Sequence, residues 1–238
     1  TLAHNRRGSG PPVLLLHGFG HTRRAWDRVI PHLVAHRDVV AVDLPGHGAS
    51  PLPAGARTLG VPDLVALVET FLDGLDVEAP VVAGNSLGGA MALELLRRGS
   101  VRAAVALAPI GFWSRWDAGY AEAVLRSSHT LARGLRAALP ALVRQPAVRA
   151  LTFGAYFADP SRLGVDEALR TARDFAETPG FDVILPGCRR YHFATSADID
   201  QDAVTIAWGD RDRLLLRHQA ARARRLLPAA RHIRIPDA

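Results

Sequence analysis

The chain has 238 residues, of which 48% are hydrophobic, so it is long enough for one large α/β domain or for a core domain with an insertion. It carries 29 basic and 23 acidic residues and a net charge of +6, but every basic residue is arginine and the arginines are dispersed. This composition is typical of a GC-rich bacterial genome, so we expect no nucleic-acid partner, and the lack of a run of about 18 apolar residues predicts no membrane span.

Predicted strands and helices alternate in the first half of the chain. Apolar residues recur at helical spacing over 22–35 and 61–75, and aliphatic runs predict strands at 13–16, 38–42, 81–83 and 101–107. Near-continuous apolar strands separated by helices indicate an α/β fold with a mostly parallel central sheet and helices on both faces.

The alternation stops between residues 110 and 196. This region is poor in strands and has helical spacing over 118–144, broken by Pro140, and over 166–177. A strand at 203–208, a helix at 214–227 and a last strand at 232–235 follow it. We therefore expect one core, formed by residues 1–109 and 197–238, with 110–196 inserted as a helical cap.

A G-x-S-x-G pentapeptide, Gly84 to Gly88, follows the strand at 81–83 and precedes a helical run. Strand, turn and helix in this order are the context of a nucleophile elbow, which holds a serine on a strained turn. Glycine is needed at both flanking positions because strand and helix backbones crowd the serine. The Ser86 hydroxyl is then expected above the sheet at a helix N-terminus, where partial positive charge stabilises an oxyanion.

A glycine-rich turn, His17-Gly18-Phe19-Gly20, follows the first aliphatic run. Such a turn aims the Phe19 N–H at the same point as the Leu87 N–H, and two donors of this kind form an oxyanion hole. His17 and His21 also allow a metal-site interpretation, but the pair lies on a glycine turn without a nearby carboxylate. We expect no metal and no cofactor.

Carboxylates follow two further strands. Asp43 opens the loop Asp43-Leu44-Pro45-Gly46-His47-Gly48-Ala49-Ser50, which we expect it to hold through backbone N–H contacts, with His47 in a structural role. Asp210 and Asp212 compete for the role of an acid that orients a catalytic imidazole. The G-x-x-D spacing favours Asp212 because it places this residue beyond the end of the strand. For either aspartate, the alternative role is an Asx turn with a helix cap.

These four motifs, in this order on alternating strands and helices, resemble the α/β-hydrolase superfamily over Leu14 to Ile235. The resemblance implies that Ser86 is the nucleophile, Asp212 the triad acid, and Phe19 and Leu87 the oxyanion donors. Serine in place of aspartate argues against the haloalkane dehalogenases and epoxide hydrolases of this superfamily. The Gly-Asn-Ser form of the elbow also occurs in its carbon–carbon bond hydrolases, so that reaction stays open.

The family order implies a catalytic histidine in a loop after the last strand. That strand is followed here only by Pro236-Asp237-Ala238, so we expect the histidine just beyond residue 238. His218, in an arginine-rich helix, and His232, within the strand, are poorly placed to reach the nucleophile.

The resemblance implies a serine hydrolase of carboxylic esters that acts on a small apolar ester, in a pocket lined by Phe112 and Trp113. One alternative is a non-catalytic ligand-binding protein of the same fold, and cofactor-free peroxidase chemistry is another. Cys188 is the only cysteine, which excludes an internal disulfide and favours the cytoplasm. The acyl preference, the oligomeric state and the removal of a leader stay open.

Overall fold

A seven-stranded sheet forms the centre of the protein, whose computed structural model describes residues 1–75 and 77–238. The strand order is β1-β3-β2-β4-β5-β6-β7, with β1 antiparallel to β3 and every other pair parallel. The strands are β1 (His4–Arg7), β2 (Pro12–Leu16), β3 (Asp38–Val42), β4 (Val81–Asn85), β5 (Ala103–Leu107), β6 (Val204–Gly209) and β7 (Arg231–Ile235). The predicted mostly parallel α/β sheet is confirmed.

One face of the sheet carries the main hydrophobic core. Helix α2 (Val61–Asp73) packs on α3 (Leu87–Arg97), which lies against β4 and β5, and α9 (His218–Leu226) contributes Ala223 to the same core. Alternate strand residues such as Val82, Ala104 and Val204 are buried on this face. The parallel register aligns them across neighbouring strands, so one helical layer covers a continuous apolar surface.

The second face is covered at β2 and β3 by a 3₁₀ helix, η1 (Arg23–Trp26), and by α1 (Ile30–Leu33). Trp26 and Ile30 form a separate core with the strand residues on this side. The single helix expected over 22–35 is therefore wrong. Pro31 lies in the first turn of α1, where its missing N–H costs no hydrogen bond, so a new helix begins there.

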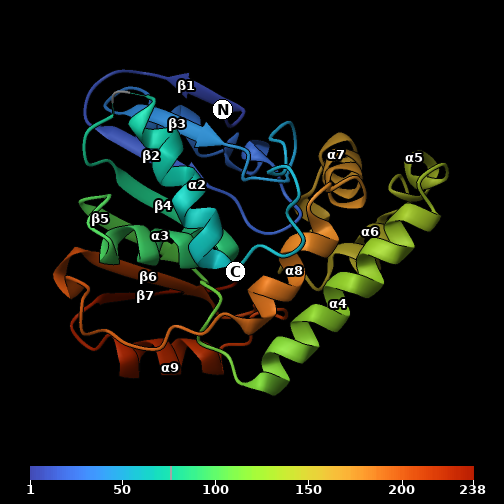
Figure 1. Cartoon of the computed structure of the whole chain (residues 1–238). Coiled ribbons are helices and arrows are strands. Elements are labelled where there is room, and N and C mark those ends of the chain that lie inside the picture. Colours follow the sequence, from blue (N-terminus) through green and yellow to red (C-terminus); the bar gives the residue numbers. More distant parts are fainter. Residues whose placement is uncertain (76) are drawn as a thin grey trace.

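Residues 110–196, here called the helical segment, contain no strand among the residues that the structure describes. Figure 1 shows its helices gathered beyond the carboxyl ends of the parallel strands. They are α4 (Arg115–Gly134), α5 (Leu139–Leu142), α6 (Pro146–Phe153), α7 (Val165–Ala176) and α8 (Phe181–Arg190), with 3₁₀ turns η2 (Pro160–Arg162) and, after the segment, η3 (Gln201–Ala203). The helix expected over 118–144 ends earlier, at Gly134, and restarts as α5 beside Pro140.

The helical segment has a small core of its own and is anchored to the sheet domain at its base. Leu139, Phe153 and Ala172 belong to this separate core. At the base, the Trp113 indole donates a hydrogen bond of 2.9 Å to the Tyr191 carbonyl, and the Tyr191 hydroxyl donates one of 2.8 Å to Glu94 of α3. No helix in the described part of the chain is both long and apolar enough to span a bilayer.

The contact between β4 and the start of α3 leaves no room for side chains. A Cβ atom at Gly84 would lie 2.0 Å from the Gly88 carbonyl oxygen, and one at Gly88 would lie 2.3 Å from the Leu16 carbonyl oxygen. Both distances are far below van der Waals contact with rigid backbone atoms. Glycine at these two positions is thus a requirement of the fold.

We expect Gly88→Ala to lower the free energy of unfolding by about 3 kcal/mol or more, because β2, β4 and α3 would have to separate. Gly119→Ala is the matched control. Gly119 lies within α4 with open space around it, so alanine there should stabilise by about 0.5–1 kcal/mol through helix propensity. Urea denaturation of both variants measures the two effects, and equal midpoints would contradict the crowding argument.

Candidate active site

Ser86 lies on the sharp turn between β4 and α3 and has a backbone conformation of φ 53° and ψ −109°. A non-glycine residue at positive φ is strained and needs support from its surroundings. The Ser86 N–H donates to the Leu107 carbonyl at 2.9 Å, and the Ser86 carbonyl accepts from Ala90 and Ile110. These bonds fix the turn at the carboxyl ends of β4 and β5.

The turn at 17–20 packs directly against this serine. A Cβ atom at Gly18 would lie 2.9 Å from the Asn85 Oδ1 and 3.4 Å from the Ser86 Cβ. Phe19 therefore follows a residue in contact with the elbow. Leu87 is the first residue of α3, so its N–H has no acceptor one turn earlier within the helix. The structure brings together three of the predicted site residues, Phe19, Ser86 and Leu87, which line one small cavity.

His17 is fully buried and has a defined tautomer. Its Nε2 accepts a hydrogen bond of 2.9 Å from the Leu44 N–H, so the proton lies on Nδ1, which donates to the Gly18 carbonyl at 2.7 Å. Burial, with a further contribution from His47, holds the pKa of His17 well below its ordinary value. The ring is therefore a neutral structural element, and its Nε2 is not available to a metal.

Asp43 holds the loop that follows β3, as predicted. Its buried carboxylate accepts hydrogen bonds from the N–H groups of Arg23 (2.7 Å) and Ala49 (2.9 Å) and forms an ion pair with the Arg23 guanidinium. The Ser50 hydroxyl donates to the Asp43 carbonyl at 2.6 Å. One side chain thus joins η1 to the loop over 43–50.

His47 is buried beside the oxyanion turn. Its Nδ1 lies 3.0 Å from the Pro45 carbonyl, and its ring meets the Phe19 ring edge-on, with centroids 5.5 Å apart. Burial lowers the pKa of His47 to about 4. A neutral imidazole at this position packs against the side chain of a candidate oxyanion residue and has no contact with Ser86 that would make it a base.

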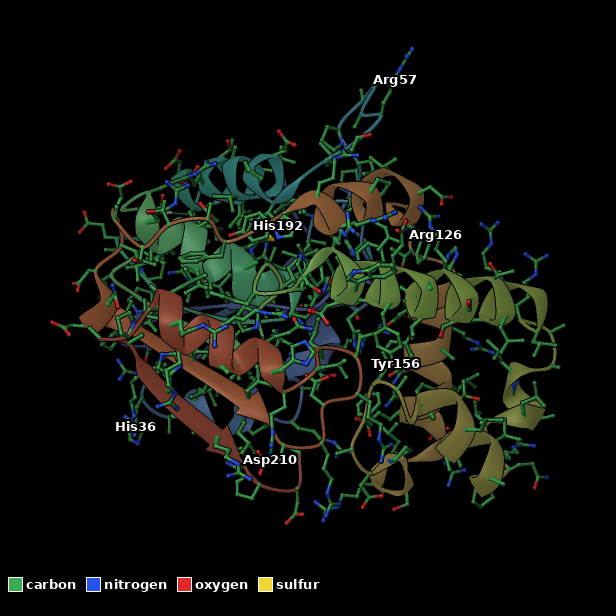
Figure 2. The ribbon with its side chains drawn as sticks, turned by 90° about the horizontal axis from the view of Figure 1, so that it is seen from below. His36, Arg57, Arg126, Tyr156, His192 and Asp210 are labelled. Atoms are coloured by element: carbon green, nitrogen blue, oxygen red, sulfur yellow. The ribbon has the colours of Figure 1, made fainter. Side chains whose placement is uncertain are left out.

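Asp210 and Asp212 differ clearly in their surroundings. Asp210 forms an exposed ion pair with Arg234 at 2.5 Å, which keeps its pKa low; Figure 2 places Asp210 at the carboxyl ends of β6 and β7. Asp212 is more buried, and this burial raises its pKa, although its Oδ1 accepts hydrogen bonds from the N–H groups of Leu214 and Leu215. These two bonds are those of an Asx turn, and they leave the second carboxylate oxygen for another donor.

The two later histidines have other partners. His218 lies 2.9 Å from the carboxylate of Asp117, and His232 lies 2.8 Å from the Leu227 carbonyl. Burial would raise the pKa of Asp117, but hydrogen bonds from Ser114, Arg222 and His218 outweigh it and keep the pKa below its ordinary range. This cluster was not predicted from the sequence, although Ser114-x-x-Asp117 has capping-box spacing.

The cavity at Ser86 is small, about 30 Å³, and Trp113 lines it beside Ile110. Phe112 does not line this cavity, because its side chain is buried against Phe193, with the two ring centroids 5.0 Å apart. Of the two predicted pocket residues, the structure therefore places only Trp113 in the cavity at Ser86.

A larger cavity of about 390 Å³ lies inside the helical segment and reaches Phe19. Leucine, valine and phenylalanine side chains from α4 to α7 form most of its wall, and Tyr156, labelled in Figure 2, lies among them. Phe19 lines both this cavity and the one at Ser86, so the two cavities are neighbours at this side chain. The Phe19 ring also lies 5.3 Å from Phe181, on which His129 stacks at 3.6 Å.

Residues 11–238 match the family model of the alpha/beta hydrolase fold. The chain belongs to this family. It is also 33% identical to the dihydrolipoyllysine-residue acetyltransferase component of the acetoin cleaving system of Pseudomonas putida, over 96% of this chain and 58% of that protein. A 2-hydroxy-6-oxo-2,4-heptadienoate hydrolase of Pseudomonas putida is 39% identical over 38% of this chain and 34% of its own length. The chain thus spans less than two thirds of these relatives.

Solved structures agree with the family. A thermophilic esterase from Thermogutta terrifontis is 20% identical, covers all of this chain and 85% of its own, and superposes with a TM-score of 0.73. At this level of identity the likeness concerns the fold alone.

The buried histidines of this α/β hydrolase predict acid sensitivity. As the pH falls from about 6.5 toward 4, unfolded His47 takes up a proton that the folded protein excludes, so the free energy of unfolding should fall by about 1.4 kcal/mol per pH unit from this residue. His47→Gln should reduce the slope of stability against pH over this window. His36→Gln, at an exposed position, is the control and should leave the slope unchanged, as followed by urea denaturation at several pH values. Equal slopes in all three proteins would contradict a buried neutral His47.

Proposed function

We propose that the chain is a serine hydrolase that cleaves carboxylic esters, with Ser86 as the nucleophile. The observation that carries this proposal is the strained Ser86 turn, supported by three backbone hydrogen bonds and packed against the turn at Gly18. Backbone strain of this kind persists where the surroundings enforce it, and it is common at catalytic residues. The family and the esterase fold of its structural relative agree with a hydrolase.

The proposed reaction proceeds through an acyl-enzyme. The Ser86 oxygen bonds to the ester carbonyl carbon while its proton passes to a general base, and the carbonyl oxygen becomes an oxyanion. The N–H groups of Phe19 and Leu87 are proposed to stabilise this charge, which is worth about a hundredfold or more in rate for each donor. The tetrahedral intermediate then collapses and expels the alcohol, which takes up the proton held by the general base. Water attacks the acyl-enzyme by the same steps and releases the carboxylic acid.

Asp212 is the proposed acid. Its burial and its free second oxygen favour it over Asp210, whose carboxylate is paired with Arg234. The general base stays a prediction, namely a histidine beyond residue 238. In its support, the Ala238 carbonyl accepts the Arg211 N–H at 2.5 Å, so Ala238 lies in the turn that carries Asp212.

The substrate class follows from the cavity in the helical segment, which we propose acts as a cap. Within the described residues no Asp, Glu or Arg side chain lines this cavity. Burial lowers the pKa of His21 and raises that of Tyr156, so both polar rings are neutral near pH 7. An uncharged, apolar cavity that shares Phe19 with the cavity at Ser86 favours an ester with an apolar acyl chain.

Carbon–carbon bond hydrolysis is the second candidate, because the relative with the printed name 2-hydroxy-6-oxo-2,4-heptadienoate hydrolase is 39% identical over 94 residues. Turnover of a vinylogous diketone without turnover of p-nitrophenyl esters would favour it. A protein that binds such ligands without turning over either class would favour the non-catalytic alternative.

We expect the full-length protein to hydrolyse p-nitrophenyl esters and to be labelled covalently by a fluorophosphonate, with both properties lost in Ser86→Ala by at least about a thousandfold. Asp212→Asn should lose activity by a similar factor because the imidazole would lose its orienting acid. Asp210→Asn is its matched control and should retain activity. Full esterase activity in Ser86→Ala would overturn the proposal.

The cavity in the helical segment predicts a preference for long acyl chains, and a bulky side chain that fills the cavity should remove this preference. Ala132 lines the cavity and Ala123 lies exposed on the same helix. We expect Ala132→Trp to lower kcat/KM for octanoyl esters by about tenfold or more while acetyl esters are hydrolysed as before. Ala123→Trp should change neither. If Ala132→Trp lowered kcat/KM equally for octanoyl and acetyl esters, the cavity would not hold the acyl chain.

A further inference from the structure

The far end of the helical segment has an unusual charge pattern. Between Ala123 and Ala158 the sequence holds five arginines and no aspartate or glutamate, although acidic residues are common elsewhere in the chain. This stretch comprises the second half of α4, then α5 and α6, which Figure 1 shows at the tip farthest from the sheet. The tip is therefore a basic surface carried by three helices.

Four of these arginines lack an acidic partner within the described residues; one of the four, Arg149, donates to the Val143 and Arg144 carbonyls. Arg126, labelled in Figure 2, forms ion pairs with Glu122 and Asp182, whereas Arg133, Arg136 and Arg144 form none among the described residues. All three are exposed. Their charge is thus available to an anionic partner.

Exposed leucines lie on the same tip. Leu131, Leu135 and Leu151 are exposed by 54%, 40% and 86%, and all three line the apolar cavity of the helical segment. They come from α4, from the turn after it and from α6, so the cavity wall brings them together and they form its mouth. An aqueous surface gains nothing from a cluster of exposed leucines, which instead indicates contact with an apolar phase.

We propose that this tip docks on an anionic lipid surface, with the cavity mouth facing the bilayer. Leucines that enter the acyl boundary and arginines that meet lipid phosphates are the features of an interfacial binding site. The long arginine side chains let their charges reach the headgroups while the leucines lie deeper. A nucleic acid would use the arginines but not the leucines, and an acidic protein would not require the cavity behind them.

The first test is sedimentation with vesicles of phosphatidylcholine alone or with 30% phosphatidylglycerol. The Ser86→Ala variant is used beside the unaltered protein, so that the outcome does not depend on any catalytic activity. We expect both proteins to bind the anionic vesicles at least about tenfold more tightly than the neutral ones, and salt to weaken this binding. No binding to anionic vesicles, or equal binding to both compositions, would overturn the proposal.

Paired variants then locate the surface. We expect Leu151→Glu to weaken binding to anionic vesicles by about tenfold or more, and Arg136→Ser and Arg144→Ser by about fivefold each. Trp116→Glu replaces an apolar side chain that is 76% exposed at the other end of α4, and Arg224→Ser removes an exposed charge from α9. Both controls should bind as before.

Equal losses in the controls, or no loss in Leu151→Glu, would contradict docking through the tip. Binding of an oligonucleotide that competes with the vesicles and is unaffected by Leu151→Glu would assign the arginines to nucleic acid and overturn the lipid proposal.

Discussion

Three stretches of backbone meet at the elbow with no side chain between them, and the rest of the structure depends on that approach. The end of β2 lies against Gly88, Gly84 near the end of β4 lies against the Gly88 carbonyl, and α3 starts at Leu87. The contact sets how closely α3 lies against the sheet, and with it the position of Ser86 on the turn. A looser elbow would change the depth of the helix, the packing of the main core and the position of the serine together.

The loops around the elbow are held by buried polar groups in addition to hydrophobic packing. His17 joins the turn after β2 to the loop after β3, and Asp43 joins that loop to η1. Because these groups are buried, their charge states are fixed: the imidazoles of His17 and His47 stay neutral. A buried polar network of this kind positions a backbone well only when every member has its partner. Both ring nitrogens of His17 have partners and hold the candidate oxyanion turn to the loop beside it, whereas the buried His47 Nε2 and Arg23 Nε have none among the described residues.

The strands, the elbow and the order of the motifs could be predicted from the sequence because each is a local property. Strand β3 is a plain aliphatic run, and Gly84 and Gly88 are imposed by backbone contact. The prediction of one helix from residue 22 was wrong because Trp26 and Ile30 have helical spacing although they lie in two separate elements, the 3₁₀ helix η1 and the short helix α1 that begins beside Pro31. The cavity in the helical segment could not be predicted from the sequence. Its wall is formed by side chains from four helices, and no local sequence pattern specifies how these helices pack on one another.

The arginine-rich composition has a second consequence at the two edges of the sheet. In the described sheet β7 is an edge strand, and Ile233 and Ile235 are each 38% exposed, an arrangement that invites another copy to add its own strand. Arg231 and Arg234 alternate with them, and the opposite edge, β1, carries Arg6 and Arg7. Arg6 and Arg234 form ion pairs with Asp38 and Asp210, so the exposed Arg7 and Arg231 supply the positive charge that opposes pairing with another sheet at the two edges.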